Sequence, residues 1–182
     1  MKTVQQLVDK YYTSNDYSML RDRTKQDYKY FLSVMCKEFG DVKYKDLTSK
    51  QAKHAYEDWV ARGISLANHV CTVSSIVFRY AIDMEYATIN PFANVKRKSA
   101  PQRKVVWTED DVRQFLDTAY STFEWRSIGL IVHMAYEWCQ RLGDMRLLTW
   151  DNFDFANRKL SLEQSKRRSQ VTLPIEDDLY DM

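Results

Sequence analysis

Three charged side chains in the C-terminal third of the sequence have the types and spacing to act on a phosphate group. Arg141 stands just after the most apolar run of the chain, Asp144 follows three residues later, and Lys166 lies in a turn between two apolar runs. An arginine binds phosphate through paired hydrogen bonds, a carboxylate one helical turn away orients it, and a lysine can transfer a proton. The alternative is an Arg141–Asp144 pair that only stabilises a helix end, with Lys166 solvated.

A second concentration of positive charge lies in the middle of the chain. Five of the nine residues from Lys96 to Lys104 are basic and none is acidic, although the net charge of all 182 residues is only +2. A short cationic strip suits a polyanion, and an ordinary solvated linker is the alternative. The basic residues of the strip are Lys96, Arg97, Lys98, Arg103 and Lys104.

The composition indicates a helical protein with real cores. Hydrophobic residues make up 45% of the chain, whereas four Gly and three Pro are too few for a turn-rich all-β fold. No apolar run approaches the roughly 20 residues that a membrane-spanning helix needs. Three widely spaced cysteines form neither a disulfide framework nor a CxxC metal site, so we expect reduced thiols in a cytoplasmic protein.

Residues 1–95 have the apolar periodicity of four amphipathic helices. Each such helix must bury its apolar stripe against another, so the sequence predicts a compact helical bundle. The expected helices cover Val4–Tyr12, Tyr28–Phe39, a segment capped by Thr48 that ends near Gly63, and a segment capped by Ser65 that ends before Pro91.

Residues 96–106 are interpreted as a basic interdomain linker, because they lack apolar periodicity and contain Pro101. Thr108 with Asp111 then predicts a capped helix start. Ile128–Ala135 is apolar nearly all round, which predicts a central helix.

The last third of the chain changes its period. A short helix is expected through Leu147 and Leu148, and from Phe153 onward apolar residues alternate with polar ones, which predicts a three-stranded antiparallel meander. The last seven residues, EDDLYDM, look like the start of another helix, so we expect a truncated protein. Residues 107–182 therefore form the second predicted domain.

Residues 141–155, RLGDMRLLTWDNFDF, resemble the first catalytic box of the tyrosine recombinase, or phage integrase, family. That box runs Arg-x-x-Glu-x-x-x-Leu-x-Trp-x-Asp, so Arg141 falls on its arginine and Asp144 on its acidic position. The hairpin QSKRRSQVTLPI is similar to the next element of the family, a β-turn lysine before a Val-Pro-Leu-like strand, and Lys166 falls on that lysine. The Asn90–Pro91–Phe92 run resembles the exit of the family's core-binding domain.

The resemblance implies a fold and a set of partners. The fold is mainly α with a small β meander: a four-helix, SAM-like core-binding bundle followed by a truncated α+β catalytic domain with a three-stranded antiparallel sheet. The partner is double-stranded DNA at a recombination site, with a homotetramer expected for the full-length protein. The setting is the cytoplasm of a bacterial or phage-infected cell, near the nucleoid, where phage genomes integrate.

The resemblance also implies a mechanism. A tyrosine attacks the scissile phosphate and leaves a 3′-phosphotyrosine, with no cofactor and no metal. Arg141 would stabilise the charge on the phosphate, Lys166 would protonate the departing 5′-oxygen, and Asp144 would hold Arg141. DNA contacts would come from the five basic residues of the strip Lys96–Lys104, together with Arg167 and Arg168.

The sequence departs from the family pattern at several positions, with Asp144 in place of the commoner Glu and Asn152 in place of a common Asp. Trp138 and Cys139 replace the usual Thr-Gly before the arginine, which alters the packing around Arg141. The later His-x-x-Arg box and the nucleophilic tyrosine have no match here, because Tyr180 comes too early. We therefore expect a chain that binds DNA but does not cleave it; a naturally truncated, non-catalytic DNA-binding protein and a helical interaction protein are the alternatives.

Overall fold

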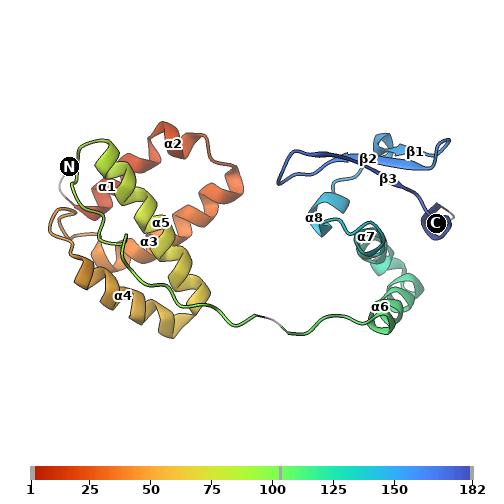
Figure 1. The fold of residues 1–182 in the computed structure, drawn as a ribbon, viewed down its shortest axis with the longest axis horizontal. Helices are drawn as coiled ribbons and strands as arrows, with labels where there is room; N and C mark the ends of the chain where they lie inside the picture. The colour runs from red at the N-terminus through yellow and green to blue at the C-terminus, as the bar shows by residue number, and fades with distance from the viewer. Residues whose placement is uncertain (1–2, 103, 181–182) are drawn as a thin grey trace. The chain divides into compact units, whose positions relative to one another are not determined.

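The computed structural model describes residues 3–102 and 104–180, and the chain divides into two compact units, Met1–Arg103 and Lys104–Met182. The described residues of the first unit form helices (Figure 1), together with one isolated β-bridge between Thr3 and Lys43. Its helices are α1 (Val4–Tyr12), α2 (Asn15–Ser18), α3 (Asp22–Phe39), α4 (Ser49–Arg62) and α5 (Ile64–Asp83). The four predicted helices are confirmed, and the short α2 is an addition to them.

The junction between α4 and α5 corrects one prediction. Thr48 and Gln51 form the expected capping box at the start of α4, but Ser65 does not cap α5. The helix begins at Ile64, two residues before the start that a Ser65 cap implies, because Gly63 alone makes the connection with φ of 143°. This backbone conformation is open to glycine and strained for other residues, so the chain turns within a single residue.

The Asn90–Pro91–Phe92 run closes the core of the first unit. Phe92 is fully buried and its ring stacks on Trp59 at a centroid distance of 6.4 Å. Asn90 makes this possible, because its side-chain amide donates to the Ser75 carbonyl while its oxygen accepts the backbone N–H of Phe92. The segment after α5 is therefore held back against the bundle.

The second unit combines helices with a small sheet. Its helical elements are α6 (Glu109–Ser121), the 3₁₀ turn η1 (Phe123–Trp125), α7 (Arg126–Glu137), α8 (Leu142–Met145), the 3₁₀ turn η2 (Trp150–Asn152) and α9 (Asp177–Tyr180). Its strands are β1 (Phe153–Asp154), β2 (Lys159–Glu163) and β3 (Gln170–Pro174). They pair in the order β1-β2-β3 and both pairs are antiparallel, which confirms the predicted meander.

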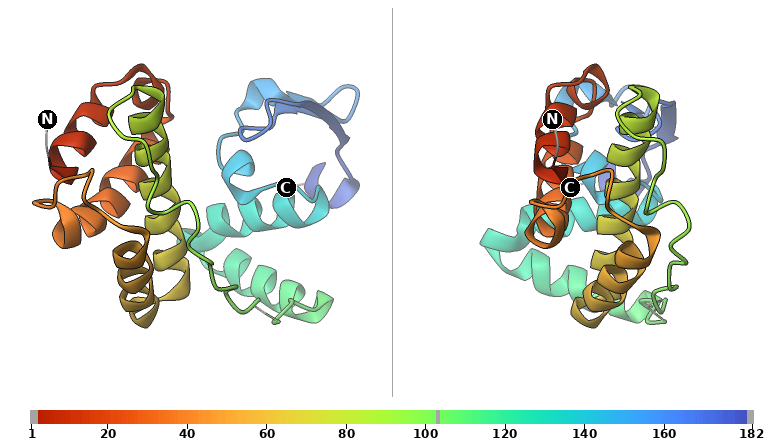
Figure 2. Two further views of the ribbon diagram at one scale, coloured as in Figure 1. Left: turned by 60° about the vertical axis from the view of Figure 1, so that its left-hand side comes forward. Right: turned by 90° about the vertical axis from the view of Figure 1, so that its left-hand side faces the viewer.

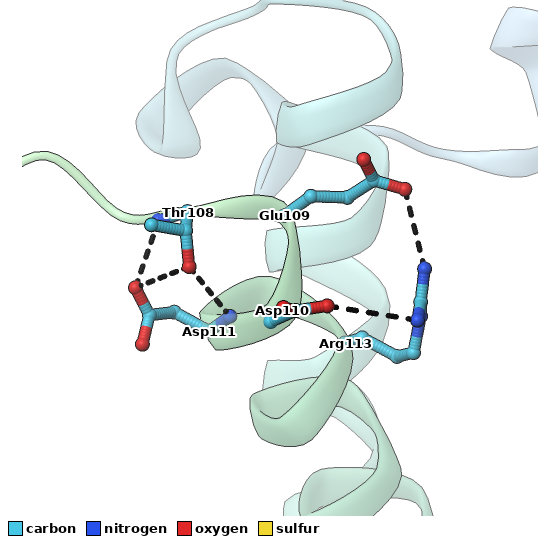
Figure 3. A network of polar contacts seen from close by, with 5 residues as sticks. All are labelled: Thr108, Glu109, Asp110, Asp111 and Arg113. Carbon is cyan, nitrogen blue, oxygen red and sulfur yellow. Dashed lines mark hydrogen bonds and ion pairs between the residues drawn. The ribbon is translucent and has the colours of Figure 1, made fainter.

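The start of α6 agrees with the sequence expectation. The Thr108 hydroxyl accepts the backbone N–H of Asp111, and the Asp111 carboxylate accepts the backbone N–H of Thr108 (Figure 3). Arg113, one turn on, contacts the carboxylates of Glu109 and Asp110. The acidic first turn also complements the positive end of the helix dipole, so this end of α6 is well defined.

Helix α7 lies between α6 and the sheet, as the views in Figures 1 and 2 agree. Gly129 permits the contact with α6, because a Cβ atom there would stand 2.9 Å from the Cβ of Ala119. The expectation that the apolar run is buried on all sides is wrong, however. Ile128 is 55% exposed and Leu130 is 37% exposed, so the described elements of this unit leave part of the α7 surface uncovered.

The core of the second unit lies between α7 and the inner face of the sheet. It consists of Met134, Trp138, Met145, Leu160, Leu162 and Ile175. The short helix expected through Leu147 and Leu148 is shorter than predicted. It ends at Met145, and the chain continues as a turn into η2, so Leu147 is exposed.

Candidate functional site

Arg141 lies in the connection between α7 and α8, at the position just before the first residue of α8. Arg141 lies outside the apolar helix that precedes it, because α7 ends at Glu137, and its side chain is 44% exposed. The guanidinium therefore remains hydrated and able to meet an incoming anion. It does not need a partner to compensate for burial.

Asp144 is the buried member of the pair. Its side chain is 2% exposed, and its Oδ2 lies 3.6 Å from a terminal nitrogen of Arg141. The other carboxylate oxygen, Oδ1, accepts the backbone N–H of Ser165 at 3.1 Å. Hydrogen bonds from Ser165, with the positive charge of Arg141, hold the pKa of Asp144 below its usual range, although burial opposes them. The carboxylate is therefore ionised at neutral pH and attracts the guanidinium.

The hydrogen bond to Ser165 links two segments that are far apart in the sequence. Ser165 begins the turn between β2 and β3, and Lys166 is the next residue. Asp144 thus contacts Arg141 on one side and the backbone beside Lys166 on the other. Through this one carboxylate the structure connects the three residues whose spacing first suggested phosphate chemistry.

Two further hydrogen bonds join the α7–α8 connection to the β2–β3 hairpin. The side-chain amide of Gln164 donates to the side-chain oxygen of Gln140 at 2.7 Å. The indole N–H of Trp138 donates to the carbonyl of Pro174 at 2.8 Å, while its ring packs in the core. Sequence reasoning missed Gln140, Gln164 and Ser165, because nothing in the local pattern joins residues 24 or 21 positions apart.

Cys139 has a left-handed backbone conformation, with φ of 49°. This is the position at which the sequence has cysteine where the resembled pattern has glycine. The positive φ lets the chain leave α7 and bring Arg141 to the start of α8 within a few residues. An L-residue with a side chain is strained in this conformation, so the local backbone would accept glycine more readily.

The turn between β2 and β3 presents three cations. Lys166, Arg167 and Arg168 are all exposed, and none forms an ion pair with any residue that the structure describes. The turn itself is closed by backbone hydrogen bonds between Gln164 and Ser169 and between Arg168 and Gln164. The three side chains are therefore displayed from a defined loop and carry uncompensated charge.

The basic residues of the strip Lys96–Lys104 differ in their contacts and in their exposure. Lys98 is anchored to the first unit, because it pairs with Glu57 and its backbone N–H donates to the Tyr56 hydroxyl at 2.7 Å. Burial raises the pKa of the Cys71 thiol, and Arg97, which lies beside the thiol, opposes part of that rise. Lys96 and Lys104 are exposed, and Arg103 lies outside the described residues.

The described residues show neither a metal-binding cluster nor a membrane-spanning helix. No group of three or more His, Cys, Asp or Glu side chains within residues 3–102 and 104–180 is arranged to hold a metal ion. Over the same residues, no helix has both the length and the apolar character needed to cross a membrane.

Comparison with known proteins gives a consistent result. Residues 106–182 match the phage integrase family. The fold of the whole chain matches a lambda integrase tetramer bound to a Holliday junction, with a TM-score of 0.85 at 21% sequence identity over 100% of this chain and 54% of that one. It also matches a lambda integrase dimer bound to a COC′ core site, with a TM-score of 0.82 at 22% identity over 94% of this chain and 48% of that one.

A third match is the Tn1549 transposon integrase in complex with a circular intermediate DNA. Its TM-score is 0.82 at 16% identity, over 100% of this chain and 63% of that one. No curated protein shows significant sequence similarity to the chain. The chain spans between 48% and 63% of the length of these three structures, so it corresponds to a part of each.

Proposed function

We propose that this chain belongs to the phage integrase family, that of the tyrosine recombinases, which residues 106–182 match, and that it binds duplex DNA and contributes the first half of a recombinase active site. The observation that carries the proposal is the buried Asp144, which contacts both Arg141 and the turn that bears Lys166. Residues 1–95 serve as the core-binding domain, 96–106 as the linker, and 107–182 as part of the catalytic domain.

Arg141 acts on the phosphate in this proposal. Its exposed guanidinium donates hydrogen bonds to the non-bridging oxygens, on which negative charge increases in the transition state of strand cleavage. Asp144 keeps the guanidinium oriented, because the carboxylate is buried, ionised and itself fixed by the Ser165 N–H. The orientation exists before DNA arrives, so little reorganisation is needed when it binds.

Lys166 supplies the proton in this proposal. Its ammonium group gives a proton to the 5′-oxygen that leaves when the phosphate is attacked, and a lysine on a short turn can approach that oxygen. Arg167 and Arg168 contribute neighbouring phosphate contacts, as do the cations of the strip Lys96–Lys104. The setting we propose is a bacterial or phage-infected cell, where DNA in the cytoplasm is accessible.

The 182-residue chain has no residue that matches the family's nucleophilic tyrosine, so we propose that it binds DNA without forming a covalent adduct. The proposal is tested with a nicked duplex in which a covalent intermediate would accumulate. We expect a mobility shift on a native gel and no protein–DNA adduct on a denaturing gel. An adduct formed by this chain alone would overturn the second part of the proposal.

The DNA-binding part is tested by titration at several salt concentrations. Each phosphate contact releases condensed counterion, so Arg141→Ala and Lys166→Ala should each reduce the slope of log K against log salt by about 1. Arg113→Ala is the matched control, because it removes the same charge from an arginine already paired with Glu109 and Asp110. Binding that is absent, or that does not depend on salt, would favour a helical interaction protein instead.

A further inference from the structure

The basic strip is held to the first unit at Lys98 by a closed ring of hydrogen bonds. The backbone N–H of Lys98 donates to the Tyr56 hydroxyl at 2.7 Å, and this hydroxyl donates to the side-chain oxygen of Asn68 at 2.8 Å. The side-chain amide of Asn68 donates in turn to the Lys98 carbonyl at 2.9 Å. Both polar groups of the Lys98 backbone are therefore fixed by side chains of α4 and α5.

The ring fixes the backbone of Lys98 but not its ammonium group. Tyr56 is 1% exposed, so its hydroxyl is a rigid partner, whereas the Lys98 side chain is 48% exposed. A lysine ammonium group is carried on a flexible stem and can change partners while the backbone stays in place. An anion that approaches from solvent can therefore meet this ammonium group without displacing the strip from the bundle.

Glu57 is the present partner of the ammonium group. Its Oε2 lies 2.5 Å from the Nζ of Lys98, and its side chain is 59% exposed. Glu57 follows Tyr56 directly on α4, so the group that fixes the Lys98 backbone and the group that pairs with its side chain are neighbours. A carboxylate offers a lysine the same kind of ligand as a phosphate does, an anionic oxygen.

Lys98 differs in this respect from the other described cations of the strip. Lys96 and Lys104 form no ion pair with any residue that the structure describes, and Arg97 lies beside the Cys71 thiol rather than a carboxylate. Among these four cations, Lys98 is therefore the one whose charge a carboxylate compensates. An exposed ion pair of this kind is weak enough for an incoming anion to displace it.

We propose that Glu57 is an autoinhibitory group that competes with the phosphates of DNA for Lys98. This inference rests on the proposed function of the chain. In the free chain the ammonium group pairs with Glu57, and it must give up this contact before it can contact a phosphate. Lys98 therefore adds less affinity for DNA than its charge predicts, and the strength of the Glu57 ion pair determines the reduction.

The test is a double-mutant cycle on the full chain, measured by titration of a duplex at several salt concentrations. Glu57→Gln keeps the shape of the side chain and releases Lys98, so we expect DNA binding to become about two- to fivefold tighter, the range that an exposed ion pair supports. The slope of log K against log salt should become steeper by about 0.9, because one more phosphate contact releases counterion. Lys98→Gln alone should change both quantities little.

The cycle separates the ion pair from the general effect of removing a negative charge. Glu57 also lines a hollow of about 590 Å³ together with Lys50, Lys53 and Lys96, so its loss strengthens the attraction of these lysines for DNA as well. That contribution persists when Lys98 is replaced. We therefore expect most of the effect of Glu57→Gln, but not all of it, to disappear in the Lys98→Gln background.

The neighbouring carboxylate provides the matched control. Asp58 is exposed on α4 and forms no ion pair with any residue that the structure describes, so Asp58→Asn should change the affinity equally with and without Lys98. If Glu57→Gln behaves in the same way, the inference is overturned while the proposed function stands. A wild-type chain that fails to bind DNA overturns the proposed function, and the inference with it. Unchanged thermal unfolding and unchanged amide exchange at Lys98 show that the bundle and the ring are intact in each variant.

Discussion

At the scale of single residues, Asp144 combines burial with charge in a way that determines its chemistry. One oxygen accepts a backbone hydrogen bond from Ser165, while the other is buried without a hydrogen bond and faces Arg141 at 3.6 Å. A buried carboxylate oxygen without a full complement of donors attracts any cation that can approach it. The exposed guanidinium is therefore held near one position.

The pH dependence of stability should report the charge of Asp144. Its pKa is lowered in the folded chain, so the stability it contributes is present above the ordinary carboxyl value of 3.8 and is lost as pH falls through the folded pKa. We expect Asp144→Asn to reduce the loss of stability below about pH 4. Thermal unfolding of both proteins across that range checks this.

Asp154→Asn is the comparison for that experiment, because the pKa of this exposed carboxyl is also lowered, by hydrogen bonds from Asn157. It should leave the affinity for DNA unchanged, whereas Asp144→Asn should weaken it through Arg141. Identical pH profiles for wild type and Asp144→Asn would contradict the assignment of a buried, ionised carboxylate.

Cys139 offers a second prediction at the residue scale. Its φ of 49° strains a cysteine by about 1–2 kcal/mol, and glycine would relieve that strain. The greater conformational freedom of glycine in the unfolded chain would offset part of this gain in stability. We expect Cys139→Gly to increase the free energy of unfolding by about 0.5 kcal/mol. Urea unfolding followed by tryptophan fluorescence measures the difference, and Cys139→Ala, which keeps the strain, should not stabilise the protein.

At the scale of elements, the β2–β3 hairpin is attached to residues 138–144 through three hydrogen bonds. Asp144, Gln164 and Trp138 each make one hydrogen bond across this boundary. They come from different turns of the chain, so together they restrict rotation of the hairpin as well as its distance. The Lys166 turn is thereby positioned by the connection that carries Arg141.

The Gln140–Gln164 hydrogen bond can be tested with a double-mutant cycle. Each single change to alanine should destabilise the second unit by about 1 kcal/mol, and the double change should cost less than the sum of the two. Amide hydrogen exchange at Ser165 and Arg168 should become faster in both single variants. Additive effects, with unchanged exchange in the turn, would show that the two amides do not act together.

At the scale of the whole molecule, the chain consists of two units that each have a core of their own. The segment between Lys98 and Thr108 is exposed at every residue for which burial is described. Lys98 itself is held by Glu57, by the Tyr56 hydroxyl and by Asn68, whose amide donates to the Lys98 carbonyl. The basic strip is therefore anchored to the helices of the first unit as far as Lys98.

Limited digestion with trypsin should distinguish the anchored part of the basic strip from the part that is not anchored. We expect early cleavage after Lys104 and slow cleavage after Lys98, because a protease needs several residues of unanchored backbone around the bond. Tyr56→Phe removes the hydroxyl that accepts the Lys98 N–H and should accelerate cleavage there. Mass spectrometry of the fragments gives the order of cleavage, and equal rates at the two sites in wild type would contradict the anchoring.

Local sequence patterns predicted most of the elements of this fold. The capping boxes at Thr48 and Thr108 marked helix starts correctly, and the alternation after Phe153 predicted the meander. Ser65 does not cap α5, because Gly63 alone connects α4 to α5 and the helix begins before Ser65. These signals succeed because a cap, a helix face and a strand face are determined within a few residues of the chain.

The sequence by itself also determined the order and spacing of Arg141, Asp144 and Lys166, and the family resemblance that follows from them. Only the tertiary structure decided that Asp144 is buried while Arg141 is exposed, and that α4 and Lys96 share a hollow. Burial and convergence depend on how distant elements pack. The contacts that decide them, such as Asp144 with Ser165, join residues whose separation no local periodicity can record.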